Sequence, residues 1–367
     1  MVRQQYPKLE VNLNALKENV EHMVNLCKMQ GVEIAGVTKG TTGLAKCAEM
    51  FELGGCTMLA SSRLEQIEEA RDYGIELPYM LLRVPMISEI PEVIRLTDIS
   101  LNSELSVLKA LNEEAGLQSK IHEVILMADL GDLREGFWDK DEMLQVALEV
   151  ENNMDNLILA GVGTNLGCYG SVLATEEKLD ELVIIAEKVE GVIGRELKYI
   201  SGGATSSLMR VLDGDLPKRV NLLRCGEGIL LARDLDVFYG YNMDFMHQDV
   251  YNLKAEIIEV KEKPTHPVGK LAVDAFGKTP KYVDRGIRRR ALVGIGKVDY
   301  GSIEEIFPKL DGVRIIGASS DHTILDVDDC KEDLNPGDIL EFGVDYASLV
   351  YLTNCKNVQI DYIETLI

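Results

Sequence analysis

The sequence lacks the residue patterns that mark disulfide frameworks, metal centres and membrane spans. Its seven cysteines are an odd number with no Cys-x-x-Cys pair, and its five histidines show no metal-ligand spacing. We therefore expect reduced thiols in a cytoplasmic protein, and no bound metal ion. No apolar run reaches the length of a membrane span, and the start, Met1-Val2-Arg3-Gln4-Gln5, has no apolar core typical of a signal peptide.

Positive charge is also scarce. Lys and Arg number 38 against 61 Asp and Glu, which gives a net charge of −23. A surface of this sign repels nucleic acid and anionic membranes, so neither is expected as a partner. The acidic residues are spread along the chain, and there is neither a low-complexity tract nor an evident internal sequence repeat. The charge therefore indicates a solvated acidic surface and does not identify a substrate.

What the sequence does contain is a regular alternation of apolar runs and helical patterns. Leu13, Leu16, Val20 and Met23 recur at helical spacing and predict a helix over 12–29. Eight apolar runs follow, most of them separated by a plausible helix, at 32–38, 57–60, 79–83, 99–102, 123–129, 157–164, 197–201 and 219–224. Eight strand–helix units predict an α/β fold with a TIM-like (β/α)8 barrel over residues 1–235.

The pattern changes in residues 236–367. Short strands with tight turns replace the helical segments, and no strong helix is predicted apart from a possible turn at 303–308. The predicted strands are 250–260, 270–274, 290–295, 313–317, 323–327, 338–342 and 357–363. We therefore predict a second, mainly antiparallel β domain after the barrel. A length of 367 residues suits such a pair of domains.

Polar and glycine-rich segments follow several barrel strands, at the end where a (β/α)8 barrel has its active site. Lys39 follows the first strand among glycines and threonines, where burial would lower its pKa and favour a nucleophilic amine or a Schiff base. The segments after strands seven and eight are SGGATSS at 201–207 and RCGEG at 224–228. Because glycines let backbone N–H groups approach an anion, these two loops predict a phosphate site.

A lysine that faces a phosphate site predicts pyridoxal 5′-phosphate (PLP) as cofactor. Lys39 would hold its aldehyde and the two loops its phosphate. Arg224 would lie near the pyridine ring. Because arginine only donates hydrogen bonds, it leaves the ring nitrogen unprotonated, which favours simple exchange of the Cα proton over transamination.

The whole chain resembles the fold-type III PLP-dependent amino-acid racemases, in which an alanine-racemase-like barrel precedes a β domain. Lys39 and the Asp-x-Gly-x-x-Arg segment Asp129–Arg134 occur in the family's order, and segments 201–207 and 319–322 look most like its ornithine branch. The resemblance implies a homodimeric isomerase with shared active sites, with ornithine as the first expected substrate and lysine as the second. The alternatives are a racemase of alanine or of broad specificity, a fold-type III decarboxylase or aldolase, and a PLP carrier without enzymatic activity.

The resemblance also implies roles for single residues. Arg134 would orient the substrate carboxylate or a second base, and Asn165 would stand at the stacking position where alanine racemases carry histidine. The implied cofactor-binding residues are Lys39, Asn165, Thr205, Ser206, Arg224, Gly226, Glu227 and Tyr351. The implied catalytic residues are Lys39, Arg134, Asp321 and His322.

The chain departs from the family at three positions. Gly43 replaces a tyrosine, Met127 replaces a lysine that is carbamylated in some members, and Phe276 replaces the tyrosine that protonates the second face of Cα. Phenylalanine cannot transfer a proton, and racemisation needs acid–base groups on both faces or one group that reaches both. The candidates for the second group are Asp321, His322, Asp274 and Tyr282. Asp321 or Asp274 could instead hold the distal ammonium of a basic substrate.

Overall fold

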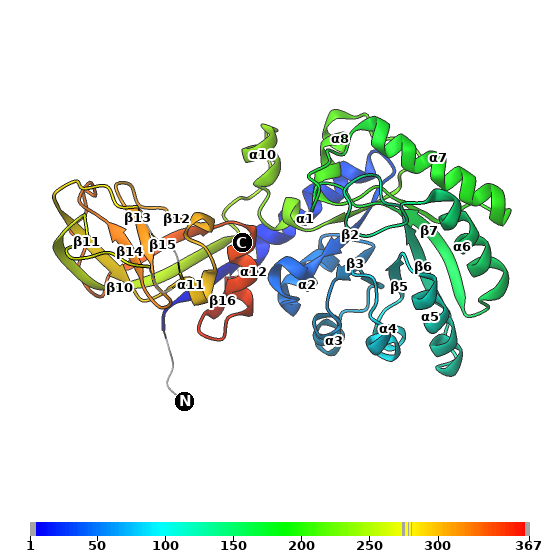
Figure 1. The fold of residues 1–367 in the computed structure, drawn as a ribbon, viewed down its shortest axis with the longest axis horizontal. Coiled ribbons are helices and arrows are strands. Elements are labelled where there is room, and N and C mark those ends of the chain that lie inside the picture. Colours follow the sequence, from blue (N-terminus) through cyan, green and yellow to red (C-terminus); the bar gives the residue numbers. More distant parts are fainter. Residues whose placement is uncertain (1–4, 274–275, 278, 280, 364–367) are drawn as a thin grey trace. The chain divides into compact units, whose positions relative to one another are not determined.

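The chain forms two compact units. One comprises Asn14–Gln248, and the other joins residues up to Leu13 with residues from Asp249 onward. The computed structural model describes residues 5–273, 276–277, 279 and 281–363. Figure 1 shows one unit as a barrel with helices around it and the other as a folded β-sheet. Within the described residues, no helix is long and apolar enough to cross a membrane.

The first unit is a closed barrel of eight parallel strands, which confirms the predicted (β/α)8 architecture. The strands are β2 (Glu33–Val37), β3 (Met58–Ser61), β4 (Tyr79–Leu81), β5 (Ile99–Asn102), β6 (His122–Met127), β7 (Leu157–Gly163), β8 (Tyr199–Ser201) and β9 (Leu222–Cys225). Ile34 of β2 pairs with Leu223 of β9, so the first and last strands close the barrel. Because all eight strands run parallel, the loops after their carboxyl ends gather at one end of the barrel.

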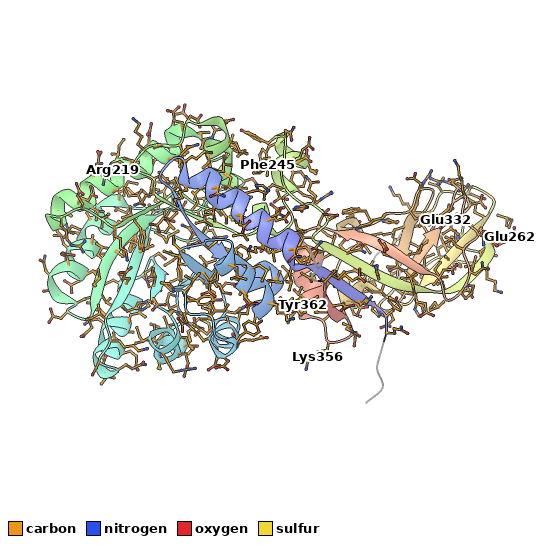
Figure 2. All side chains as sticks on the ribbon, turned by 180° about the vertical axis from the view of Figure 1, so that it is seen from behind. Arg219, Phe245, Glu262, Glu332, Lys356 and Tyr362 are labelled. Carbon is orange, nitrogen blue, oxygen red and sulfur yellow. The ribbon has the colours of Figure 1, made fainter. Side chains whose placement is uncertain are left out.

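Helices surround the barrel (Figure 1). They are α1 (Leu13–Lys28), α2 (Ala45–Leu53), α3 (Leu64–Tyr73), α4 (Ile90–Leu96), α5 (Leu105–Leu117), α6 (Lys140–Asn153), α7 (Glu176–Ile193), α8 (Leu208–Asp213), α9 (Glu227–Leu230) and α10 (Asp234–Tyr239). Three short 3-10 turns are η1 (Thr38–Thr41), η2 (Ile87–Glu89) and η3 (Thr205–Ser207). On the outer surface, Arg219 donates hydrogen bonds of 2.7 and 2.9 Å to Glu190 of α7 (Figure 2). This pair ties the chain before β9 to a surrounding helix.

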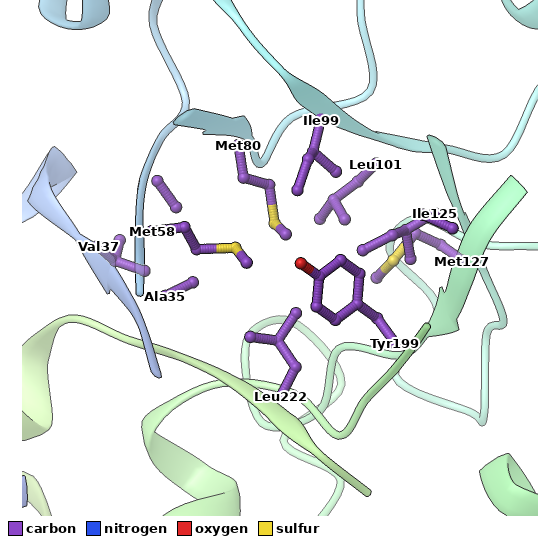
Figure 3. Close-up of a cluster of buried hydrophobic side chains, with 12 residues drawn as sticks. Ala35, Val37, Met58, Met80, Ile99, Leu101, Ile125, Met127, Tyr199 and Leu222 are labelled. Atoms are coloured by element: carbon purple, nitrogen blue, oxygen red, sulfur yellow. The ribbon is translucent and has the colours of Figure 1, made fainter. Parts of the chain in front are cut away.

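Apolar side chains from the strands form a buried cluster in the barrel unit (Figure 3). Met58, Met80 and Met127 are at most 2 % exposed, and Tyr199 is 7 % exposed. Full burial of such a side chain contributes about 1.5–3 kcal/mol, so this core fixes the strand ends from which the loops start. Met127 packs here as an ordinary core residue, at the position where some racemases carry a carbamylated lysine.

The second unit is a mainly antiparallel sheet, which confirms the predicted β domain. Its strands are β1 (Lys8–Asn12), β10 (Tyr251–Pro264), β11 (Ile287–Val293), β12 (Ile306–Pro308), β13 (Arg314–Ala318), β14 (Thr323–Asp326), β15 (Ile339–Val344) and β16 (Gln359–Ile363). The strand order is β12-β15-β10-β11-β14-β13, with β1 paired to β10 and β16. The helical elements are α11 (Lys297–Tyr300), η4 (Ile303–Glu305) and α12 (Tyr346–Asn354).

The local predictions for this unit differ from the structure in three places. Residues 270–273 form no strand, while Asp274, the last residue of that predicted strand, lies outside the described residues. In the segment predicted as a possible turn at 303–308, the turn is confirmed for η4, whereas the remaining residues form β12. The helix α12 was not predicted, because its sequence YASLVYLTN is rich in β-branched and aromatic residues that favour strands. The helix nevertheless buries Ser348, Leu349 and Leu352 on one side, so tertiary packing overrides local preference.

The two units divide the chain differently from the predicted boundary after residue 235. The strand β1 pairs antiparallel with β10 and parallel with β16, so the first strand belongs to the sheet and not to the barrel. At the other boundary, the Asn19 side chain of α1 hydrogen-bonds to the backbone N–H and carbonyl of His247, at 2.7 and 2.8 Å. The ring of Phe245 packs edge-on against His22 of the same helix (Figure 2). The segment up to Gln248 therefore belongs to the barrel unit.

Candidate active site

Lys39 lies at the carboxyl end of the first barrel strand, in the turn η1. Burial lowers the pKa of its ammonium and outweighs the opposing effects of Cys168 and Glu135, while the charges of Arg134 and Arg224 act in the same direction as burial. A lowered pKa increases the share of neutral amine, which is the form that attacks carbonyls and accepts protons. Gly43, four residues later, has a φ of +81°, and a Cβ there would lie 2.4 Å from the Cβ of Gln66. This backbone therefore excludes the tyrosine that alanine racemases carry at that position.

Arg224 lies on the last barrel strand and is only 4 % exposed. Its guanidinium donates one hydrogen bond to the Ser201 hydroxyl at the end of β8, and another of 2.7 Å to the Thr164 carbonyl after β7. Burial lowers the pKa of Arg224 to about 10, so the side chain remains a cation and a donor at neutral pH. The ends of three adjacent strands thus fix the orientation of this cation.

The loops after β8 and β9 meet at the same end of the barrel. The backbone N–H of Gly228 donates to the Thr205 hydroxyl at 3.1 Å, and a Cβ on Gly228 would lie 2.9 Å from the Thr205 methyl carbon. Glycine is therefore required for this approach. Ser206 donates to the Leu166 carbonyl at 2.9 Å, which attaches the loop after β7 as well. The loops that carry the predicted phosphate residues Ser206 and Gly226 are therefore in contact, whereas Tyr351 belongs to the other unit.

Two buried polar atoms beside these loops have no hydrogen-bond partner among the described residues. They are Nδ2 of Asn165 and Oε2 of Glu227, and each residue is 8 % exposed. The other oxygen of Glu227 accepts from the backbone N–H groups of Arg233 and Asp234, at 3.3 and 3.2 Å, near the start of α10. Burial and the neighbouring Asp234 carboxylate raise the pKa of Glu227 to about 8. Glu227 is therefore largely uncharged at neutral pH, which removes its repulsion of a nearby anion.

The loop after β6 is folded around Asp129. Its carboxylate accepts backbone hydrogen bonds from Gly131 at 2.8 Å and Leu133 at 3.1 Å, which shape the turn before Arg134. The Arg134 guanidinium donates two hydrogen bonds to the Glu135 carboxylate, one of them 2.6 Å long. Pairing with Glu135 raises the pKa of Arg134 and offsets much of its charge. We predicted Arg134 as a site residue but did not predict Glu135. The only indication of Glu135 in the sequence is that it directly follows Arg134.

A second loop, after β7, is attached to this one by Asp132. The buried Asp132 carboxylate accepts backbone hydrogen bonds of 3.0 to 3.3 Å from Gly167, Cys168, Tyr169 and Val172. Burial alone would raise the pKa of Asp132, but these four N–H groups outweigh it and lower the pKa. The attachment fixes the backbone of the segment that carries the exposed Cys168 side chain. Cys168 also interacts electrostatically with Lys39 and with Arg224.

Cys168 and Asp132 were both missed as site residues. The sequence favoured packed core thiols, because most of the cysteines lie in apolar stretches, but the Cys168 side chain is exposed. The available signal was its position, three residues after Asn165 in the loop that follows a barrel strand.

Asp321 and His322 lie in the second unit, in the turn between β13 and β14. Both residues are exposed. The Ser319 N–H donates to the His322 carbonyl at 2.8 Å, and the Ser320 hydroxyl donates to the Asp321 carboxylate at 2.6 Å. The turn thus presents a carboxylate and an imidazole to the surroundings, and their roles in catalysis remain predictions.

A cavity of about 980 Å³ in the second unit is lined by Tyr351, Phe276 and Tyr282. The ammonium of Lys297 lies 4.4 Å from the centroid of the Phe276 ring, so the residue that replaces the family's tyrosine packs against a cation. Asp274, a further candidate, lies outside the described residues. The cofactor contact predicted for Tyr351 stays a prediction, as does the acid–base role considered for Tyr282.

The residues at the barrel mouth fit PLP. Lys39 offers an amine of lowered pKa, suited to an aldehyde. The loops that meet at Gly228 offer hydroxyls and backbone N–H groups, suited to a phosphate. The buried Nδ2 of Asn165 still lacks an acceptor, which a bound group could supply. Within the ranges that the structure describes, no group of three or more His, Cys, Asp or Glu side chains is arranged to hold a metal ion.

A (β/α)8 barrel with a lysine after its first strand, followed by an antiparallel β unit, is the architecture of a known enzyme class. The chain belongs to the alanine racemase family, because the family described as "Alanine racemase, N-terminal domain" matches residues 11–234. It is also 38 % identical over 359 residues to an ornithine racemase of Acetoanaerobium sticklandii, which covers 98 % of this chain and 99 % of the relative. A lysine racemase of Thermotoga maritima is 38 % identical over 345 residues, or 94 % and 95 % of the two chains.

Solved structures of alanine racemases share the fold. The enzyme from Streptomyces lavendulae superposes with a TM-score of 0.76 at 18 % identity, over 99 % of each chain. The enzyme from Bacillus anthracis gives 0.75 at 16 % identity, over 100 % of this chain and 97 % of the other. At such identities the likeness concerns the fold, and it extends over both units.

Proposed function

We propose that this protein is a PLP-dependent racemase that interconverts the L- and D-forms of a basic amino acid, ornithine first and lysine second. The observation that carries the proposal is similarity along nearly the whole chain to racemases of these two amino acids. The half-buried lysine of lowered pKa and the contact between two glycine-containing loops at the barrel mouth support it independently.

Bound PLP would acidify the Cα–H bond of the amino acid by withdrawing electrons from it. Lys39 takes or returns the proton on one face of Cα, because its lowered pKa keeps neutral amine available. Arg134 orients the substrate carboxylate, and its pairing with Glu135 limits its net charge there. The residues proposed to hold the cofactor are Lys39, Asn165, Thr205, Ser206, Arg224, Gly226, Glu227 and Tyr351.

Arg224 is proposed to donate a hydrogen bond to the pyridine nitrogen. With a pKa of about 10, its guanidinium holds its proton at neutral pH and does not transfer it. The hydrogen bonds to Ser201 and Thr164 prevent it from turning away. A donor of this kind supports reversible proton exchange at Cα over transamination, which needs a protonated ring.

The proposal includes a homodimer in which the β unit of one chain completes the active site of the other. Asp321 and His322 are the residues proposed to reach the substrate from the partner. The exposed Asp321 carboxylate suits the distal ammonium of ornithine or lysine, a group that alanine lacks. His322 carries an imidazole that can bind the substrate or relay a proton. A cytoplasmic location is also proposed, since all seven cysteines are free thiols.

The test is to incubate the purified protein and PLP separately with L-ornithine, L-lysine and L-alanine, and to separate the products by chiral chromatography. We expect D-ornithine and D-lysine in excess over D-alanine. Conversion of alanine alone would overturn the assignment to basic substrates. Stable PLP binding without conversion of any amino acid would favour a cofactor carrier, and loss of the carboxyl group would favour a decarboxylase.

A further inference from the structure

The cavity in the β unit has walls that carry more positive than negative charge, although the chain as a whole has a net charge of −23. Its volume of about 980 Å³ suits a small molecule, since ligand sites commonly measure about 300–1,000 Å³. The cations that line it are Lys281, Arg285, Arg290 and Lys297, and the carboxylates are Glu304 and Asp326. A ligand in this cavity would be additional to the amino acid and the cofactor of the proposed racemase.

Both carboxylates of the cavity are engaged by other groups. Asp326 accepts a hydrogen bond of 2.7 Å from Nε of Arg288, which does not line the cavity, and another of 3.2 Å from the backbone N–H of Asp328. Glu304 accepts a hydrogen bond from the Ser302 hydroxyl. Asp326 is therefore paired outside the group of four cations, and Glu304 alone cannot balance their charge.

The four cationic side chains lack a counter-ion. In the part of the chain that the structure describes, none of their ammonium or guanidinium groups forms an ion pair or a hydrogen bond. The Nε of Arg290 is buried without a partner. The Lys297 ammonium lies 4.4 Å from the centroid of the Phe276 ring, and this contact leaves its N–H donors available. Because like charges held together repel one another, a bound anion would relieve a cost that the cavity now carries.

The sheet fixes the position of Arg290. This half-buried residue lies on β11, which is paired with β10 on one side and β14 on the other. Lys261 stands opposite it on β10, and Asp326 stands opposite it on β14. The nearest acidic partner in the sheet is thus the carboxylate that Arg288 already holds, whereas the other neighbour is a further cation. A like charge at a directly opposed position is unfavourable, so this register favours a bound anion.

The remaining walls indicate that the anion has an organic body. Tyr282, Val298, Ile303 and Ile324 supply aromatic and aliphatic surface. The donors of a guanidinium match two oxygens of a carboxylate or a phosphate, and a lysine ammonium adds a point charge. We propose that this cavity binds a small organic dianion, a phosphate ester or a dicarboxylate, and that Arg290 and Lys297 hold its charged groups.

The test measures binding by thermal stability, without turnover. Protein loaded with PLP and freed of excess cofactor is melted in a chloride buffer of constant ionic strength, at increasing concentrations of phenyl phosphate or of glutarate. A ligand that binds only the folded chain raises the melting temperature as its concentration exceeds its dissociation constant. We expect a rise with at least one of the two anions. A rise with phenyl phosphate identifies a phosphate ester as the ligand class, and a rise with glutarate identifies a dicarboxylate.

Two variants test the residues. Arg290→Gln and Lys297→Gln each remove one charge from the cavity, and both should melt near wild type without ligand, because neither side chain forms an ion pair with the described residues. We expect each to bind the effective anion about 10- to 100-fold more weakly, the range for loss of a hydrogen bond to a charged group. The matched control is Arg314→Gln, which removes the same charge from β13, where Arg314 pairs with Asp329 at 3.2 Å outside the cavity. The control should bind like wild type.

The outcomes separate this site from the proposed function. If neither anion raises the melting temperature of wild type, or if both cavity variants bind like wild type, the site is overturned. Equal weakening in Arg314→Gln would also overturn it, because the effect would then be one of overall charge. Should Arg290→Gln melt too low to be titrated, Lys297→Gln decides. Racemisation of ornithine, assayed on the same wild-type sample, supports or refutes the racemase function whichever way the anion titration ends.

Discussion

At the scale of the residue, burial decides which side chains at the barrel mouth are charged. Lys39 and Arg224 both lose part of their affinity for a proton on burial, whereas Glu227 gains affinity. The lowered pKa of Lys39 makes its amine available as a base. The lowered pKa of Arg224 still leaves the guanidinium protonated at neutral pH, so it remains a hydrogen-bond donor. Glu227 becomes a carboxylic acid that holds the start of α10 without repelling an anion.

The raised pKa of Glu227 makes stability fall towards alkaline pH. Its folded pKa of about 8 exceeds the ordinary value of 4.5, so the folded chain binds its proton more tightly than the unfolded chain. The stabilisation is complete below about pH 4.5 and is lost as pH rises through 8. We expect Glu227→Gln, which stays uncharged, to melt higher than wild type at pH 9 and to show a flatter melting temperature between pH 5 and 9.

The contrasting control is Glu190→Gln. Arg219 holds the pKa of Glu190 below its ordinary value, so this carboxylate stabilises the fold in the ionised form. Removal of the Glu190 carboxylate should therefore lower the melting temperature at neutral and alkaline pH. This change is opposite to the rise expected for Glu227→Gln. Thermal melts of wild type and the two variants between pH 5 and 9 test both expected changes in melting temperature. A melting temperature of Glu227→Gln that varies with pH in parallel with that of wild type would refute the prediction.

The sequence indicates candidate site residues where strand ends converge, but it does not indicate side chains that are placed by contacts between loops. Lys39 and Arg224 follow directly from their positions on the first and last barrel strands. Cys168 does not, because its place depends on the bonds of Asp132 to another loop, which no local pattern encodes. The predicted roles of Asp321 and His322 rest on the family resemblance and await experiment.

At the scale of the element, the approach of η3 to α9 depends on a missing side chain. A Cβ at Gly228 would meet the Thr205 methyl carbon and the Leu208 side chain, each at 2.9 Å. We expect Gly228→Ala to separate the two loops at a cost of about 1–3 kcal/mol, typical of overpacking. The affinity for PLP should fall by about 5- to 150-fold if this cost opposes binding. Titration of the cofactor-free protein with PLP measures it.

The matched control is Gly191→Ala in α7. No atom lies within 4 Å of the position of a Cβ at Gly191, so this alanine should fit and raise stability by about 0.5–1 kcal/mol. PLP affinity should not change in the control. Equal affinity in Gly228→Ala and wild type would show that the contact between these loops does not govern cofactor binding.

Elements whose sequence has a strong periodic pattern were predicted well. Elements whose conformation depends on the surface against which they pack were not. The barrel strands and α1 carry their pattern in the sequence. By contrast, α12 is built from residues that favour strands, and it is a helix because Ser348, Leu349 and Leu352 find a surface to pack against. Residues 270–273 have the composition of a strand but no neighbouring strand pairs with them.

At the scale of the whole molecule, the proposed sharing of active sites in a homodimer predicts that two inactive chains rescue each other. Lys39→Ala removes the amine from one barrel, and Asp321→Ala removes the carboxylate from one β unit. In a mixed dimer, the intact barrel of the second chain meets the intact β unit of the first. We expect co-expressed, doubly tagged heterodimers to racemise ornithine, although each variant alone should be inactive.

The control places both substitutions on one chain. In this control, a chain with both Lys39→Ala and Asp321→Ala is paired with a chain that carries only Asp321→Ala. Neither active site of this heterodimer then has both the lysine amine and the aspartate carboxylate, so it should stay inactive. Activity is measured by chiral chromatography after purification through both tags. Rescue in neither pairing would argue that each site is built from a single chain.

The order of the units along the chain was only partly foreseen. Two domains were expected, but nothing in the local pattern of Lys8–Asn12 shows that this strand pairs with β10 and β16. The segment up to Gln248 was likewise assigned beyond the barrel, although its contacts with Asn19 tie it to α1. Such pairings are long-range and become visible only in three dimensions.

The pairing of β1 has a consequence for how the protein is made. This strand is synthesised before the barrel, yet both of its partners are synthesised after the entire barrel. During translation the barrel has all of its strands available by Cys225, while β1 must wait with an unpaired edge. Strands that follow the barrel in the sequence therefore complete a sheet whose strand β1 precedes the barrel, so the β unit can close only after the barrel strands have been synthesised.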